Sequence, residues 1–413
     1  MSNKQSQLIF KHIEDSRRNM IQFMADIIRV PAIGPMSGGE GEQEKANVIE
    51  KNLVDYGFKH IRHFDAPDNR LKSKTRPNIQ VTVKGKSPGQ RIVLITHIDV
   101  VAPGAISEWE SDPFQLLEKD GKLFGRGTED NGQSLAAAIF ALRAFLDLNI
   151  QPAADIVLFF VSDEEEANEK GIRHLIENNL IQKSDLILVP DHGEPTGRLI
   201  DIVEKTILWV KVSIKGKQCH ASLPNLGKNA FRASMQFGTM VDKALHEKFN
   251  FRDASFDYPL SSFEPTKREP RKSGINVLPG EEVFYFDCRL LLVYQTQEIL
   301  DEMKTIARTA ADKTGTAIQI DPVFIEKTTH PTPSDSKIVK ALSDAIYKVT
   351  KKQAIYGGIG GGTCASVLRN AGFEVAVWET IENRAHTPNE YAVIDNMISD
   401  CKVFAQLFLT QNP

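Results

Sequence analysis

Four polar stretches, far apart along the chain, carry the residue types that bind divalent metal ions. The central one is residues 125–133 (Gly-Arg-Gly-Thr-Glu-Asp-Asn-Gly-Gln), a tight turn with Asp130 at its centre. The other three supply histidine and carboxylate side chains, and they are residues 96–99 (Thr-His-Ile-Asp), 162–166 (Ser-Asp-Glu-Glu-Glu) together with 189–191 (Val-Pro-Asp), and 384–388 (Arg-Ala-His-Thr-Pro). Two cations at short range must share a negative ligand, and each ion needs further histidine or carboxylate ligands. The sequence therefore predicts a two-metal site bridged by Asp130.

His97 and Asp99 follow an apolar run, residues 92–95, that predicts a strand buried on both faces. Ligands tend to lie at the carboxyl ends of such strands. Side chains two residues apart lie on the same face, so Asp99 can hold one ring N–H of His97 while the other ring nitrogen binds metal. A His-x-Asp pair also occurs in purely structural roles, so this motif alone leaves both interpretations open.

Glu164 and Glu165 follow a second buried strand, predicted at residues 156–161. Adjacent residues in an extended segment face different ways, so one carboxylate can bind metal while its neighbour reaches the attacking water. A general base must lie within hydrogen-bond reach of its proton, and metal coordination lowers the pKa of water toward neutrality. An acidic run can instead be a solvated helix N-terminus. Its position directly after a buried strand weakens this alternative.

His386 lies in a loop punctuated by Pro388 and Asn389, where a histidine can be either a ligand or a structural residue. The glycine-rich run at residues 357–363 offers backbone N–H groups to an anion. It lacks the lysine of a P-loop and the spacing of a dinucleotide fingerprint, so phosphate binding is not favoured.

Strand and helix patterns alternate through residue 191, which predicts an α/β sheet. The expected strands lie at residues 79–83, 92–95, 156–161 and 186–189, and the expected helices at 42–56, 134–148 and 171–178. From about residue 205, half-exposed alternating strands (207–214, 282–292 and 317–320) and two helices (229–246 and 296–314) replace them. This change predicts a smaller α+β domain of ferredoxin-like type, with a basic loop at residues 266–273.

The predicted architecture is a mixed-sheet catalytic domain with helices on both faces, interrupted by an inserted lid or dimerisation domain. Its parts are residues 1–205, the inserted domain 206–325, and residues 326–413, where long helices and buried strands resume. A length of 413 residues is consistent with two or three domains.

The composition excludes several classes of partner. A net charge of −4 provides no large basic field, so nucleic acid is not expected. We see no signal peptide and no apolar run long enough to span a bilayer. Four dispersed cysteines without CxxC spacing fit reduced thiols better than disulfides. The expectation is a cytoplasmic enzyme.

Taken together, in order and spacing, these stretches resemble over nearly the whole chain the di-zinc aminoacylase and carboxypeptidase family (peptidase M20). That family includes succinyl-diaminopimelate desuccinylase, acetylornithine deacetylase and glutamate carboxypeptidase. The resemblance implies one zinc ion held by His97, Asp130 and Asp191 and another held by Asp130, Glu165 and His386. It also implies that Glu164 is the general base on a metal-bridging water, that Asp99 orients His97, and that the Asp130–Asn131 peptide bond is cis. Cobalt or manganese would fit the same ligands.

The inserted domain carries the residues that the resemblance assigns to substrate binding. Residues 215–222 (Lys-Gly-Lys-Gln-Cys-His-Ala-Ser) are similar to the family's substrate-clamping stretch. His220 would then reach an active site, usually that of the other subunit in a homodimer, and stabilise the oxyanion. Asn276 and Arg289 match a substrate-binding asparagine and a carboxylate-binding arginine, whose fork suits a planar carboxylate. Gly361, in the glycine-rich turn, is expected to border the specificity pocket.

The sequence departs from the family pattern at Asn131, His192 and Cys364, and these departures leave the substrate open. Cys364 fits either an adventitious metal ligand or a small buried residue. The prediction is a homodimeric zinc hydrolase that cleaves the amide bond of an N-acyl amino acid, as a succinyl-diaminopimelate desuccinylase or acetylornithine deacetylase of amino-acid biosynthesis does. A dipeptidase or carboxypeptidase with the same machinery is the first alternative. A binding protein that has lost catalysis is the second.

Overall fold

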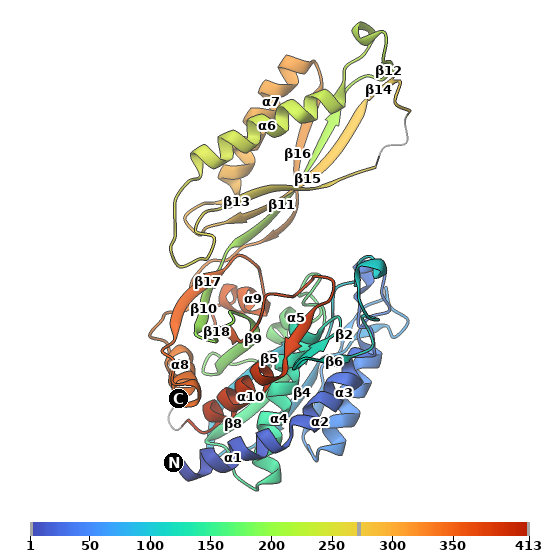
Figure 1. Cartoon of the computed structure of the whole chain (residues 1–413). Coiled ribbons are helices and arrows are strands. Elements are labelled where there is room, and N and C mark those ends of the chain that lie inside the picture. The colour runs from blue at the N-terminus through green and yellow to red at the C-terminus, as the bar shows by residue number, and fades with distance from the viewer. Residues whose placement is uncertain (1–2, 271–273, 411–413) are drawn as a thin grey trace. The chain divides into compact units, whose positions relative to one another are not determined.

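The computed structural model describes residues 3–270 and 274–410, which divide into two compact units (Figure 1). Unit 1 contains the described residues of Met1–Ile202, His330–Gly357 and Thr363–Pro413. Unit 2 contains Val203–Thr329, apart from its undescribed residues, and Gly358–Gly362.

Unit 1 is built on a mixed eight-stranded sheet with the order β1-β4-β8-β5-β9-β18-β10-β17. The strands, in that order, are Ile61–His63, Ile79–Val83, Ala154–Val161, Ser87–His97, Leu186–Gly193, Val375–Glu379, Leu199–Glu204 and Ile355–Ile359. The central strands β8, β5, β9 and β18 are parallel, whereas β1, β4 and β10 run antiparallel to their neighbours. Strands β17 and β18 come from the late part of the chain, after the long segment of unit 2, whereas β10 precedes them in the chain.

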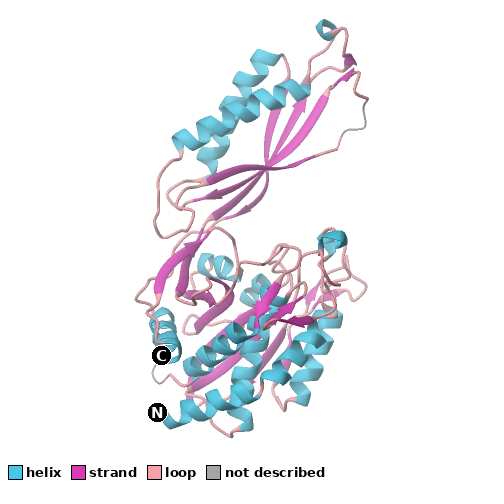
Figure 2. Cartoon of the chain, in the orientation of Figure 1, coloured by secondary structure: helices cyan, strands magenta, loops and turns pink. Residues whose placement is uncertain are grey.

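Helices cover both faces of this sheet (Figure 2). On one face lie α1 (Asn3–Asp15), α2 (Arg17–Ile28), α3 (Gln43–Asp55), α4 (Gln133–Asp147), α8 (Lys337–Thr350) and α10 (Ile394–Phe408). On the other face lie α5 (Ile172–Glu177) and α9 (Cys364–Asn370). In β8, Ile156 and Leu158 pack on the first face, and Val157 and Phe159 pack on the second. This two-sided burial explains why the strand is apolar without a break from Ile156 to Val161. The predicted mixed sheet with helices on both faces is confirmed.

Short strands surround this core. A three-stranded sheet joins β19 (Tyr391–Val393), β7 (Lys122–Phe124) and β6 (Leu117–Lys119). A small hairpin joins β2 (Ala66–Pro67) and β3 (Thr75–Arg76). Because β19 directly follows the loop of His386 and β7 directly precedes the turn of Asp130, their pairing brings these two segments together.

Unit 2 is an α+β fold of ferredoxin-like order, as predicted. Its antiparallel sheet has the order β13-β15-β11-β16, with bounds Ser262–Arg268, Glu281–Leu290, Thr206–Lys215 and Ala317–Glu326. Helices α6 (Ala230–Lys248) and α7 (Thr296–Thr314) form its core with one face of the sheet. A hairpin pairs β12 (Cys219–His220) with β14 (Val277–Leu278).

The structure corrects the sequence interpretation at three places. Residues 262–268 form strand β13, so the predicted basic loop begins as a strand, and its Arg271 and Lys272 lie outside the described residues. Strand β10 was not predicted. Strand β17 occupies the first half of the glycine-rich run. In this strand a Cβ atom on Gly358 would approach the Phe256 ring to 2.5 Å. Glycine here permits close packing of a strand and does not form a turn.

Among the described residues, no helix combines the length and the apolar character needed to cross a membrane.

Candidate metal centre

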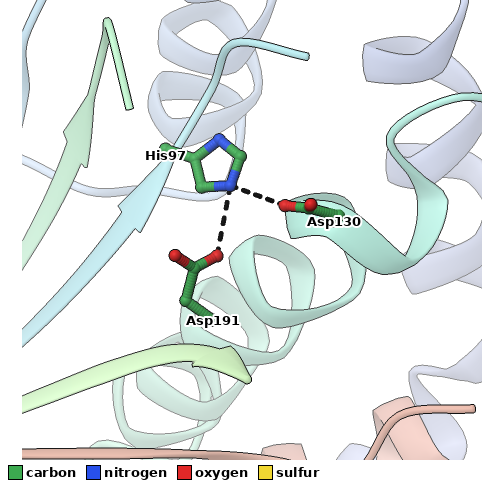
Figure 3. A group of neighbouring side chains, drawn as sticks. All are labelled: His97, Asp130 and Asp191. Carbon is green, nitrogen blue, oxygen red and sulfur yellow. Dashed lines mark hydrogen bonds and ion pairs between the residues drawn. The ribbon is translucent and has the colours of Figure 1, made fainter. Parts of the chain in front are cut away.

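His97, Asp130 and Asp191 meet at the carboxyl ends of neighbouring strands (Figure 3). His97 is the last residue of β5, and Asp191 lies near the end of β9, which pairs with β5 in parallel. Asp130 comes from the turn that leads into α4. The Nε2 atom of His97 lies 2.7 Å from Oδ1 of Asp130 and 3.2 Å from Oδ1 of Asp191. Parallel pairing thus places both strand-end side chains beside the turn.

A second group of ligand atoms meets on the other oxygen of the same aspartate. Nε2 of His386 lies 3.1 Å from Oδ2 of Asp130 and 3.0 Å from Oε2 of Glu165. Asp130 therefore presents Oδ1 to one imidazole and Oδ2 to the other, and the peptide bond between Asp130 and Asn131 is cis, as expected. A carboxylate in this position has the arrangement required of a bridging ligand.

These groups fit a pair of divalent cations. In each of the two groups, one ligand atom per residue lies within 4.8 Å of the others. A tetrahedral site with bonds of about 2.1 Å separates its ligand atoms by about 3.4 Å, close to the distances between these side chains. The imidazoles of His97 and His386 lie among more carboxylates than they can neutralise. Bound cations would therefore reduce the repulsion between these carboxylates.

Glu164 is half-buried beside this group, and its environment suits a base. Burial raises the pKa of Glu164 well above its ordinary value, and the charges of Asp191 and Glu165 raise it further. Conversely, His386 and His97 lower the pKa of Asp130 in spite of its burial. Carboxylates in one site are thus divided between a strong proton acceptor and an ionised ligand.

Asp99 connects the histidine to the acidic run. Its backbone oxygen lies 3.0 Å from Nδ1 of His97, and its carboxylate lies 3.5 Å from the same atom. The carboxylate accepts the backbone N–H groups of Glu164 at 3.2 Å and Glu165 at 3.0 Å. Asp99 therefore also fixes the backbone of Glu164, the candidate base, and Glu165, a candidate ligand, and sequence reasoning missed this role.

Glu390 is a second residue that sequence reasoning missed. It is fully buried, and its Oε1 accepts the N–H groups of Glu129 at 2.9 Å and Asp130 at 3.1 Å. Its Oε2 accepts the N–H of Gly127 at 3.1 Å and pairs with Arg126 at 2.5 Å. The turn of Asp130 is thus held by a carboxylate four residues after His386. Its only sequence signal is its position within the loop of that histidine.

A buried cluster of charges supports the acidic run from behind. The guanidinium of Arg76 is fully buried and pairs with Glu42, and its NH1 lies 3.3 Å from both Asp163 and Glu166. Oε1 of Glu166 also accepts the backbone N–H of Met36 at 2.7 Å. Burial, with the charge of Asp99, raises the pKa of Glu42 to about 7. This cluster anchors the segment that carries Glu164 and Glu165.

The residues at the three departures from the family pattern lie near the ligands or beside them in sequence. The Asn131 amide donates to Oδ1 of Asp191 at 2.8 Å, and so orients that carboxylate. Nδ1 of His192 lies 2.7 Å from Oδ2 of Asp201. Cys364 is buried, and burial together with the charge of Glu164 raises its pKa well above the usual value, so the thiol is neutral. Neither of the two ligand groups includes Cys364, and all four cysteines are free.

The candidate substrate-binding residues all lie in unit 2. His220 is exposed, with Nδ1 2.6 Å from Oγ of Ser222, and the hairpin sets it beside Asn276, whose oxygen accepts the N–H of Ala221 at 2.9 Å. These contacts bring the predicted His220 and Asn276 together.

Arg289 lies on β15 and is already paired with a carboxylate. Its Nε and NH2 donate to Asp287 at 2.7 and 2.9 Å, and its NH1 donates to the backbone oxygen of Gly360 at 3.3 Å. The residue therefore lies beside the segment of Gly361. Binding of a substrate carboxylate would compete with Asp287.

The fold and the ligand geometry define the class of metal-dependent hydrolases. Within that class the chain belongs to peptidase family M20/M25/M40, whose model matches residues 93–410. Membership identifies it as a hydrolytic enzyme, which favours the enzymatic predictions over the binding-protein alternative.

Similar proteins share nearly the whole chain. An uncharacterized metallohydrolase of Methanocaldococcus jannaschii is 36% identical over 403 residues, which cover 94% of this chain and 98% of that protein. A succinyl-diaminopimelate desuccinylase of Acidovorax ebreus is 25% identical over 341 residues, covering 81% of this chain and 83% of the relative. Among solved structures, the dipeptidase Dug1p of Saccharomyces cerevisiae superimposes with a TM-score of 0.77 at 16% identity and covers 98% of both chains. Human carnosine dipeptidase 1 has a TM-score of 0.74 at 17% identity and covers 98% of this chain and 99% of its own.

Proposed function

We propose that this enzyme cleaves the amide bond of an N-acyl amino acid at a centre of two zinc ions. The observation that carries the proposal is Asp130, whose two carboxylate oxygens face two separate imidazoles, with the half-buried Glu164 alongside. Zinc is favoured because the ligand set mixes imidazole and carboxylate. The relative named as a succinyl-diaminopimelate desuccinylase supports an acylated amino acid as the substrate class.

His97, Asp130 and Asp191 would hold one ion, and Asp130, Glu165 and His386 the other. When bound, such ions polarise the scissile carbonyl and make water a better nucleophile. Glu164 takes a proton from the attacking water as the new C–O bond forms. It then delivers the proton to the leaving amine nitrogen as the C–N bond breaks. Asp99 holds Glu164 in place through its backbone N–H.

A homodimer is part of this proposal. Strand β13 is an outer strand of the unit 2 sheet, and the adjoining hairpin region exposes Leu223 and Leu226 by 50% and 54%. An edge strand with apolar side chains nearby is a usual pairing surface for a second copy.

The decisive experiment is a set of initial rates for the zinc-loaded enzyme on matched N-succinyl amino acids, N-acetyl amino acids and plain dipeptides. The Glu164→Gln variant serves as the control, because it keeps the shape of the side chain and removes the base. We expect acylated amino acids to be preferred, and the control to be inactive on all of them.

A preference for dipeptides would contradict the substrate class while retaining the machinery. That second function deserves a place in the panel because the fold is shared over 98% of the chain with two dipeptidases. The sheet and the ligands are common to both reactions, so only the pocket distinguishes them.

A further inference from the structure

Glu129, the residue before Asp130, joins the turn of Asp130 to the loop of His386. Its side chain is 1% exposed, and its carboxylate points into that loop and not at the ligands. Oε1 accepts the backbone N–H of Glu382 at 2.6 Å, and Oε2 accepts the N–H groups of Ala385 at 3.0 Å and of Arg384. One buried carboxylate thus binds three amides within four residues.

Glu129 binds the part of the loop directly before His386, whereas the other hydrogen bonds of the loop hold the part after it, for example those of Asn389 to Glu108 at 3.0 Å and to Glu110 at 2.7 Å. Asn383 and His386 adopt left-handed backbone angles, with φ of 58° and 63°, which non-glycine residues rarely adopt without a constraint. The His386 side chain is 55% exposed, so packing does not determine its position. The backbone must therefore place Nε2, and the Ala385 amide bound by Glu129 is adjacent in sequence.

The ligands of the other group are held independently of Glu129. His97 ends a strand paired on both sides, and Asp191 lies on a paired strand and accepts a hydrogen bond from Asn131. Glu390 holds Asp130 through a different carboxylate. Loss of the Glu129 side chain should therefore disturb one ligand group and leave the other.

We propose that Glu129 is a positioning residue that holds the His386 loop and sets the affinity of the second metal ion, the one shared by Asp130, Glu165 and His386. The proposal rests on the two-metal centre of the proposed function but not on its substrate. Residues that orient a ligand from behind commonly change metal affinity by about 10- to 100-fold.

The test is a titration of the apoprotein with Co²⁺, followed by calorimetry and by the visible absorption of the bound ion. The wild type should bind two ions. For Glu129→Gln we expect the first ion to bind within about threefold of the wild-type affinity and the second to bind about 10- to 100-fold more weakly. His386→Ala removes a candidate ligand of the second ion, so its titration shows the binding expected when the second site is lost. No substrate is needed, so an error in the substrate class cannot affect the outcome.

Asp155→Asn is the matched control. Asp155 is a buried carboxylate that accepts the N–H of Gly85 at 2.9 Å, near the start of β8 and hence at the opposite end of that strand from the ligands. Asp155→Asn likewise removes the charge of a buried carboxylate that accepts a backbone N–H, together with its ion pair to Lys84 at 2.8 Å, and both ions should bind as in the wild type.

Three outcomes would overturn the proposal: Glu129→Gln binding both ions with wild-type affinity, both ions weakening equally, or the wild type binding a single ion. If Glu129→Gln does not fold, Glu129→Asp keeps the charge but shortens the side chain by one methylene. It should weaken the second ion selectively, and unchanged binding of both ions would refute the role.

Discussion

At the scale of single residues, the surroundings of each carboxyl group in the candidate metal centre determine whether its pKa is raised or lowered. Glu164 and Asp130 carry the same functional group. Burial and neighbouring carboxylates raise the pKa of Glu164, and two imidazoles lower that of Asp130. The same functional group thus has opposite pKa shifts at two neighbouring positions, as the proposed roles of Glu164 as base and Asp130 as ligand require.

The role of Glu164 leads to a kinetic prediction. Glu164→Gln should lower kcat by about 10²- to 10⁴-fold, the usual contribution of a general base, while two metal ions still bind. Steady-state rates together with metal analysis of the purified variant check this. A variant with full metal content and near wild-type kcat would remove Glu164 from the reaction.

Asp400 leads to a prediction about pH and stability. Burial raises its pKa to about 7, although the N–H and hydroxyl of Thr380 donate to it at 2.7 Å. The folded protein therefore holds this proton more tightly than the unfolded chain, whose pKa is near 3.8, so stability is lost as pH rises between these values. Asp400→Asn should raise the free energy of unfolding at pH 8 by up to about 4 kcal/mol and have little effect at pH 4.

Urea unfolding at the two pH values checks this, with Asp344→Asn, an exposed position inside helix α8, as the control that should change neither. Equal effects of Asp400→Asn at both pH values would contradict the explanation.

The candidate metal ligands could be anticipated from sequence, whereas Glu129 and Glu390, which bind the segments that carry them, could not. His97 and Asp191 follow apolar runs, and such runs indicate strand ends where ligands gather. Glu129 and Glu390 act by accepting backbone N–H groups from segments some 250 residues away. A backbone amide has no residue identity, so no sequence pattern marks its partner.

At the scale of elements, the paired strands β9 and β18 approach each other closely next to Asp191. Gly193 pairs with Glu379, and a Cβ atom there would lie 1.8 Å from the backbone oxygen of Glu379. Only glycine allows this approach two residues from the candidate ligand Asp191.

Gly193→Ala should therefore separate the two strands and destabilise unit 1 by about 1–3 kcal/mol, as overpacking does, and weaken metal binding through Asp191. Thermal unfolding and Co²⁺ titration measure the two effects. Gly238→Ala is the control, because a Cβ on Gly238 in helix α6 meets nothing within 4 Å. Alanine in a helix should stabilise the protein slightly. Equal behaviour of the two variants would contradict the packing argument.

Long apolar or periodic elements were predictable, and short or glycine-bearing ones were not. Helix α7 and strand β8 have clear periodicity or an unbroken apolar run. Strand β17 contains two glycines, and β13 is exposed over most of its length and contains a proline and two basic residues. Their strand conformation depends on neighbours distant in sequence, which local patterns do not record.

At the scale of the whole molecule, each unit has its own core and all metal-ligand candidates lie in unit 1. Metal binding should thus stabilise one unit only.

Calorimetry should show two unfolding transitions, of which chelation lowers one. Phe286→Ala, which truncates a side chain in the unit 2 core, should lower the other. A single transition that moves as a whole under both treatments would show that the units do not unfold independently.

The homodimer proposal can be tested by mixing inactive subunits. Glu164→Gln and His220→Ala subunits should restore about a quarter of the wild-type activity when half of the dimers are hybrids, because each hybrid then contains one intact site. Proven hybrids without activity would contradict a shared site.

The position of β18 in the sheet has a consequence for synthesis on the ribosome. This strand lies between β9 and β10 but follows them in the chain by more than 170 residues. A nascent chain that has just completed unit 2's long segment still leaves the inner edges of β9 and β10 unpaired and lacks His386. Domains fold as units during synthesis, so unit 2 can finish first. The growing polypeptide therefore exposes the unpaired edges of β9 and β10 until β18 has emerged from the ribosome. A chaperone would protect the chain during this interval.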